Sequence, residues 1–179
     1  THFLSHLNHD ASGALGAYLA LTATPINAAS AIDAGLADVY CPAAQLPDLL
    51  AALEEGDFAN SSAVRAAALA FCKPFSTGDS AIAPLRSDIE AAFSHPSVAA
   101  IVSALSAAQT PFAETALKAM RRASPLMVHA TLHALQRSKS STLAQALRME
   151  RSLMHRCFAH GEPVEGSRAV AVDKDHSPR

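Results

Sequence analysis

The segment at residues 142–161, TLAQALRMERSLMHRCFAHG, contains the longest helical pattern of the chain. Its apolar residues include Leu143 and Leu147, which have the four-residue spacing that places side chains on one face of an α-helix. Gly161 follows, and glycine readily adopts the left-handed conformation that ends a helix. The pattern therefore predicts a helix from about Thr142 to His160.

Most of the remaining chain shows the same periodicity. Alanine supplies about 40 of the 179 residues and tryptophan none, a composition that favours closely packed helices over a sheet. Only residues 36–40 form a candidate strand. The sequence thus predicts a mostly α fold with at most one short strand near residues 37–40. Further helices are predicted at residues 12–22, 27–35, 46–56 and 60–71, from starts at or near Pro96, Pro111 and Pro125, and over residues 163–172.

The second of these helices has clear signals at both ends. Asn27 can accept a hydrogen bond from the free amides of the first turn, which makes it the expected N-cap. Gly35 is expected to end the same helix.

The chain divides by composition into two parts. Residues 1–40 form the first part, and residues 41–179 are expected to form a helical region. The family resemblance given below implies that the first part ends a larger core. The stretch from Lys73 to Pro84 contains two prolines, one glycine and small polar residues. Such a stretch is typical of a mobile loop or of the seam between two subregions.

Charge and hydropathy exclude several kinds of partner. The chain has 14 basic and 16 acidic residues, a net charge of −2, so we expect no nucleic-acid partner. No apolar run is long enough to span a bilayer, so no membrane partner is expected. Neither an initiator methionine nor a leader precedes Thr1, and we expect the chain to be part of a longer protein. Cys41, Cys72 and Cys157 are odd in number and far apart, which favours reduced, buried thiols and a cytoplasmic location.

Two histidine pairs have the spacing of one helix face, His2 with His6 and His129 with His133. A helix-borne zinc protease site also needs a glutamate directly after the first histidine and a third ligand, whereas Ala130 follows His129. We therefore expect no metal site, and exposed histidines instead.

No motif for covalent catalysis or phosphate binding occurs in the sequence. A Gly-x-Ser-x-Gly elbow and a glycine-rich phosphate loop are both absent. The carboxylates are expected on solvated helix faces rather than in acid/base pairs. These are Glu54 with Glu55, Asp173 with Asp175, and Glu150 beside Arg148 and Arg151.

Three groups of short sequences together resemble one family over nearly the whole chain. The groups are THFLS (1–5), GAYLALT (16–22) and AGLAD (34–38); SP (124–125), TL (131–132) and LAQALRME (143–150); and EGSRAV (165–170), DKD (173–175) and SPR (177–179). They are similar to the C-terminal half of the enoyl-CoA hydratase/isomerase (crotonase) superfamily, most closely to its 3-hydroxyisobutyryl-CoA hydrolase branch.

The resemblance implies a coenzyme A thioester as substrate and no separate cofactor. In the family, two backbone N–H groups stabilise the charge that develops on the thioester oxygen, and acidic side chains transfer protons. All of these groups precede the position of Thr1, so the resemblance assigns no catalytic residue to this chain. It assigns one binding residue, Lys174, which matches a basic residue that approaches the coenzyme A phosphates. A role in balancing Asp173 and Asp175 is the alternative for Lys174.

The sequence leaves three functions open. The first is thioester hydrolysis by a longer parent enzyme, with this chain inactive alone, and the second is hydration or isomerisation of an enoyl-CoA by such a parent. The third is a non-catalytic module that binds a partner through the apolar stripes of the helices at residues 46–56 and from Pro125. In each case we expect a homo-oligomer, because a large apolar face promotes self-association.

Overall fold

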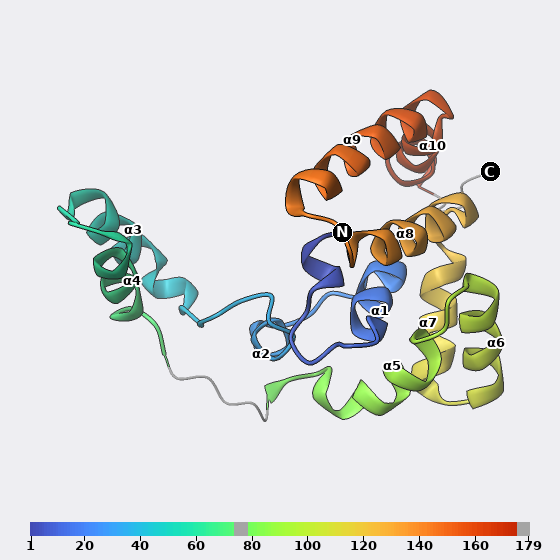
Figure 1. Cartoon of the computed structure of the whole chain (residues 1–179), viewed down its shortest axis with the longest axis horizontal. Helices are drawn as coiled ribbons and strands as arrows, with labels where there is room; N and C mark the ends of the chain where they lie inside the picture. The colour runs from blue at the N-terminus through green and yellow to red at the C-terminus, as the bar shows by residue number, and fades with distance from the viewer. Residues whose placement is uncertain (74–78, 175–179) are drawn as a thin grey trace. The chain divides into compact units, whose positions relative to one another are not determined.

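The computed structural model describes residues 1–73 and 79–174, and these residues are mainly helical (Figure 1). They divide into two compact units, one formed by residues 1–25 and 85–179 and the other by residues 26–84. The described α-helices of the first unit are α1 (Ala14–Thr22), α5 (Arg86–Phe93), α6 (Val98–Ala108), α7 (Pro111–Arg121), α8 (Pro125–Ser138), α9 (Leu143–Ala159) and α10 (Glu162–Ser167). Those of the second unit are α2 (Ala28–Asp33), α3 (Leu46–Glu55) and α4 (Ser61–Leu69). The mostly α fold expected from the sequence is confirmed.

Helix α1 forms the centre of the first unit. It packs against α5, α7 and α8, and all of its residues except Ala20 are buried. Tyr18 takes part in this packing: its ring lies 5.4 Å from that of Phe93 and 5.5 Å from that of Phe112, measured between ring centroids. An apolar helix covered on every side is expected to be a core element.

The start of α1 is set by polar groups that precede it. Asp10 accepts hydrogen bonds from the backbone N–H groups of Leu15 (3.1 Å) and Gly16 (2.9 Å). Ser12, expected as the first residue of this helix, accepts one from Ala14 at 3.1 Å. Helix α1 therefore begins two residues later than predicted, and Asp10 satisfies amides that would otherwise lack a partner.

The proline signals mark the starts of α7 and α8 as predicted. Pro111 and Pro125 are the first residues of these helices, and the preceding Thr110 and Ser124 cap them by accepting backbone hydrogen bonds. Pro96 lies further out, because Ser97 is the cap of α6 and Val98 its first residue. Helix α5 was not predicted from the sequence.

The C-terminal helices also follow the expected pattern. Helix α9 covers the predicted range, with Thr142 as its N-cap, His160 as its C-cap and the left-handed Gly161 (φ 81°) after it. The last predicted helix has two geometries, since α10 continues into a π-helical turn, Arg168–Val172. Helix α9 packs against α8 and α10.

The second unit is built from short helices. Asn27 caps α2 by accepting a hydrogen bond from the backbone N–H of Ser30 at 2.8 Å, and Gly35 (φ 75°) follows, both as predicted. The candidate strand near residues 37–40 does not become a regular strand, which agrees with the prediction of at most one: among the described residues, Tyr40 makes only an isolated antiparallel bridge with Lys73. A strand requires a partner of comparable length, and α4 ends just before this bridge.

Two further predictions concern the loop at residues 73–84 and the absence of a membrane-spanning segment. Residues 74–78 of the predicted loop at 73–84 lie outside the described residues. Among the described helices, none is both long enough and apolar enough to cross a bilayer.

Candidate functional site

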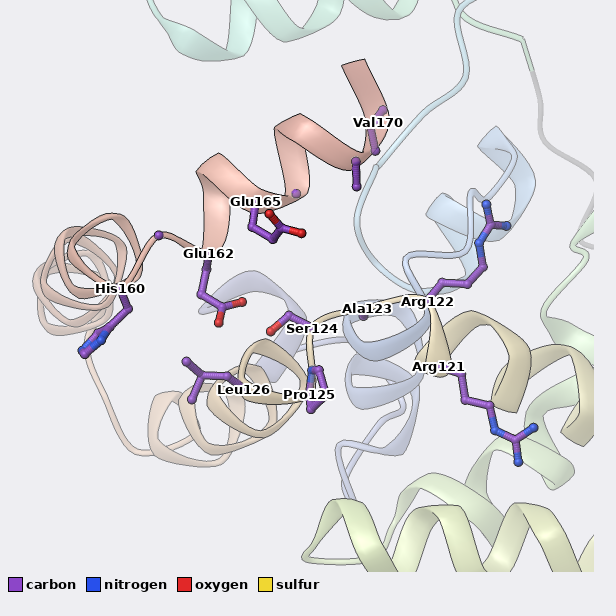
Figure 2. Close-up of a pocket in the computed structure, with 13 residues that line it drawn as sticks. Arg121, Arg122, Ala123, Ser124, Pro125, Leu126, His160, Glu162, Glu165 and Val170 are labelled. Carbon is purple, nitrogen blue, oxygen red and sulfur yellow. The ribbon is translucent and has the colours of Figure 1, made fainter. Parts of the chain in front are cut away.

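An open hollow of about 910 Å³ lies where α10 faces the turn between α7 and α8 (Figure 2). Residues 121–126 form one wall, and residues from His160 to Val170 form the other. We call it the α8–α10 hollow. The polar side chains of this hollow determine which ligands it can bind and whether it can catalyse a reaction.

Two carboxylates from α10 line this hollow. Figure 2 shows Glu162 directed towards the turn that carries Ser124, while the carboxylate of Glu165 lies beside α10 itself. Glu165 forms a bidentate ion pair with Arg168, with distances of 2.7 and 2.8 Å, and Arg168 also pairs with Asp173. Glu165 lies in the first turn of α10, near the positive end of the helix dipole, where a carboxylate is favoured.

The arginines of the opposite wall do not balance these carboxylates. Figure 2 shows Arg121 and Arg122 pointing away from both glutamates. Arg121 lies in the last turn of α7, where the helix dipole favours a cation. The side chains that face the inner part of the hollow are therefore Glu162 and apolar groups such as Leu126, a lining that does not favour a phosphate group.

The hollow holds no prepared nucleophile among its described residues. The Ser124 hydroxyl accepts a hydrogen bond from the backbone N–H of Met127 at 3.3 Å and so acts as a helix cap. His160 is exposed at the C-terminal end of α9. These groups can shape a pocket for an apolar group, but they are not arranged as a nucleophile and its base.

Lys174, the predicted coenzyme A contact, is exposed and follows the π-helical turn with φ 56°. It is not part of the wall of the α8–α10 hollow. Asp173 pairs with Arg168, and Asp175 lies outside the described residues, so the alternative that Lys174 balances Asp173 and Asp175 stays a prediction. The binding role of Lys174 stays a prediction.

The two members of each histidine pair lie near each other, as their four-residue spacing predicts. His129 and His133 are exposed on α8, and the rings of His2 and His6 lie 4.2 Å apart between centroids. Within residues 1–73 and 79–174, no group of three or more histidine, cysteine or acidic side chains is placed to hold a metal ion.

Glu150 differs from the prediction of a solvated carboxylate. Its Oε1 lies 2.5 Å from the Thr1 ammonium and 2.5 Å from the Thr1 hydroxyl, which also contacts the Ser138 hydroxyl at 3.1 Å. Hydrogen bonds from these two groups of Thr1 lower the pKa of Glu150. No local pattern could have indicated this contact, because its partners are 149 residues apart.

The cysteines also differ from the prediction. Cys157 is buried, whereas Cys41 and Cys72 are half-buried. The single bridge between Tyr40 and Lys73 brings the segments of Cys41 and Cys72 together.

Comparisons with known proteins place the chain in a family. The family model described as enoyl-CoA hydratase/isomerase matches residues 1–179. The chain is 28% identical to 3-hydroxyisobutyryl-CoA hydrolase-like protein 5 of Arabidopsis thaliana, over 98% of this chain and 47% of the relative. It is 30% identical to the mitochondrial 3-hydroxyisobutyryl-CoA hydrolase of Gallus gallus, over 94% of this chain and 44% of the relative.

Solved structures give the same result. An enoyl-CoA hydratase from Rhodobacter sphaeroides matches with a TM-score of 0.79 and 37% identity, over 99% of this chain and 48% of that one. A carnitinyl-CoA dehydratase from Mycobacterium thermoresistibile matches with a TM-score of 0.81 and 29% identity, over 96% of this chain and 47% of that one. The chain thus spans about half the length of these relatives. The resemblance inferred from its short motifs is confirmed, and the chain belongs to the enoyl-CoA hydratase/isomerase family.

Proposed function

We propose that this chain is the C-terminal portion of an enzyme that acts on acyl-CoA thioesters, with hydrolysis of 3-hydroxyisobutyryl-CoA as its reaction. The family match over residues 1–179 is the observation that carries the proposal. The hydrolase names of the relatives from Arabidopsis thaliana and Gallus gallus favour this reaction. Hydration or isomerisation of an enoyl-CoA is the second possibility, favoured by the 37% identity to the Rhodobacter sphaeroides hydratase.

In this proposal the chain shapes and covers the site but supplies no reacting group. The capping role of Ser124 and the pairing of Glu165 with Arg168 agree with a supporting function for the α8–α10 hollow. The oxyanion-binding amides and the acid belong to polypeptide that corresponds to the other half of the relatives.

An assay with two substrates tests the proposal. The 179-residue chain and a longer protein that ends in it are each given 3-hydroxyisobutyryl-CoA and crotonyl-CoA. We expect the longer protein to release free thiol from the first substrate and the chain alone to remain at background. Turnover of crotonyl-CoA alone by the longer protein favours the hydratase. Turnover by the isolated chain well above background contradicts the assignment of the reacting groups.

Lys174 is the proposed contact for the coenzyme A phosphates. Its ammonium group is exposed, and the neighbouring Asp173 is paired with Arg168. In the longer protein, Lys174→Gln should raise KM severalfold with little change in kcat. The control is Lys118→Gln, which changes an exposed residue of α7 and should alter neither KM nor kcat. Equal KM values for the two variants would show that Lys174 does not contact coenzyme A.

A partner-binding module is the second candidate function, and exposed apolar side chains favour it. On α3, Leu46 and Leu50 are 44% and 57% exposed, and on α9, Leu147 and Phe158 are 55% and 59% exposed. The stripe expected on α8 is not available, because its members Val128, Leu132 and Leu135 are buried. Self-association of the chain should appear in light scattering, and a monomer at high concentration would count against this candidate and the expected homo-oligomer.

A further inference from the structure

A second hollow, of about 770 Å³, lies between α8 and α9 and has a different chemical character. The two helices lie side by side across the turn that joins them (Figure 1). His133 and Arg137 line it from α8, one helical turn apart, and Arg148, Ser152 and Arg156 line it from α9 at successive turns. We call it the α8–α9 hollow. No aspartate or glutamate is among the described residues that line it.

The three arginines of this hollow have no carboxylate partner among the residues that the structure describes. The carboxylates Glu150, Glu165 and Asp173 form ion pairs elsewhere, with Thr1 and Arg168. Glu150 is the nearest carboxylate in sequence to Arg148, but it turns away to contact Thr1. No acidic residue stands three or four positions from any of the three arginines, so none can be paired along its own helix.

This arrangement concentrates positive charge on a chain whose net charge is −2. Like charges around one hollow repel each other, and a bound anion would relieve the repulsion. Guanidinium groups bind phosphate oxygens in a bidentate manner, which makes arginine the preferred residue for such anions.

The number of arginines indicates the kind of anion. Arg148 and Arg156 line the hollow from α9, about two turns apart, and Arg137 lines it from α8. Three guanidinium groups can hold more oxygens than a single phosphate offers, whereas a diphosphate presents terminal oxygens on both of its phosphorus atoms. We propose that the α8–α9 hollow binds the diphosphate group of a small anion, which could belong to a nucleoside diphosphate or to coenzyme A. The inference does not depend on the proposed acyl-CoA activity.

Calorimetric titration of the 179-residue chain tests the site. Inorganic diphosphate is the probe, with sulfate at equal ionic strength as the control for unspecific attraction. We expect saturable binding of diphosphate that weakens about tenfold or more in Arg148→Gln. Arg151→Gln is the matched control, because it removes the same charge from the same helix at a position outside the hollow. It should change the affinity by less than about twofold.

Further ligands identify the source of the diphosphate. ADP and coenzyme A should each compete with inorganic diphosphate for the wild-type chain. Competition by only one of them identifies the class of the natural ligand and still supports the site.

Three results would each overturn the proposal: no binding of diphosphate, an equal loss of affinity in Arg148→Gln and Arg151→Gln, or binding of coenzyme A without binding of diphosphate. Unchanged thermal unfolding of both variants shows that their folds are intact. None of these results depends on thioester turnover, so failure of this site and failure of the proposed function are distinguishable.

Discussion

Cys41 lies opposite Cys72 in the register set by the antiparallel bridge between Tyr40 and Lys73. The Lys73 N–H donates to the Tyr40 carbonyl at 2.9 Å, so the next pair along is a non-hydrogen-bonded pair. Cα atoms of such pairs are about 4.5 Å apart, which is within the range of disulfide-linked cysteines. The register therefore brings the two cysteines near each other, although 31 positions separate them in the sequence. In the structure each thiol donates to a backbone carbonyl, Cys41 to that of Pro42 and Cys72 to that of Ala68.

We predict that diamide converts this pair to an intramolecular disulfide, with the two hydrogen atoms transferred to the reagent. Desolvation raises the pKa of the Cys41 thiol, and the neighbouring Cys72 raises it further, so the reaction should be faster above pH 9.0 than at neutral pH. Intact mass and peptide mapping measure the product. Cys41→Ser should abolish it, and a product that consists only of covalent dimers would contradict the register.

Gly16 should not tolerate a side chain. A Cβ atom at this position would collide with the backbone carbonyl oxygen of Leu4, which cannot move aside as a flexible side chain would. Gly16→Ala should therefore lower the free energy of unfolding by about 1–3 kcal/mol. Urea unfolding followed by circular dichroism measures this change.

Gly166→Ala is the control for that substitution. Gly166 also lies in a helix, but a Cβ there would have no neighbour within 4 Å. The variant should be neutral or more stable by up to about 1 kcal/mol, because alanine has the better helix propensity. Equal destabilisation by both variants would show that the approach of Leu4 to α1 is not as described.

Leu132→Asp should unfold much of the first unit. Leu132 is 6% exposed and lies on the buried face of α8. The loss of packing costs about 2–5 kcal/mol, and an unpaired buried polar group costs roughly 1–3 kcal/mol more. His133→Asp, on the exposed face one residue away, should change Tm little. A thermal scan in which both variants keep the wild-type Tm would show that this face of α8 is wrongly placed.

In the 179-residue chain taken alone, where Thr1 has a free ammonium group, Glu150 should make the stability depend on pH. Its pKa lies below the ordinary 4.5 in the folded state, because the Thr1 ammonium and hydroxyl donate hydrogen bonds to its carboxylate. The stabilisation is therefore complete above the unfolded pKa and is lost as the pH falls through the lower, folded pKa.

Chemical unfolding at neutral pH and at pH values below 4.5 checks the direction of this pH dependence. Glu150→Gln should be less stable than the wild type at neutral pH, and the difference should shrink below pH 4.5. Glu54→Gln, which changes an exposed residue of α3, provides the control. A difference that grows on acidification would contradict the direction of the pKa shift.

Features within one helix could be predicted from the sequence, because they depend on neighbours a few positions away. Asn27 caps α2, Pro125 begins α8, and Gly161 follows α9, each as the local pattern predicts. The family could also be predicted, since its motifs are short and contiguous.

Features that join distant segments could not be predicted in this way. The helical period shows which residues share a face but not which helix covers that face. The stripe of α8 proved to be core, while Leu147 on α9 is exposed. The hollows could not be predicted for the same reason. Arg137 and Arg156 line one hollow from two different helices, and the sequence indicates each helix only separately.

The discontinuous first unit has a consequence for synthesis of the chain. Helix α1 is apolar and nearly all buried, yet the helices that cover it begin only at Arg86. At a translation rate of about 5–20 residues per second, several seconds separate the emergence of Tyr18 from that of Phe93 and Phe112. During that interval the nascent segment offers an uncovered apolar surface, of the kind that ribosome-associated chaperones shield.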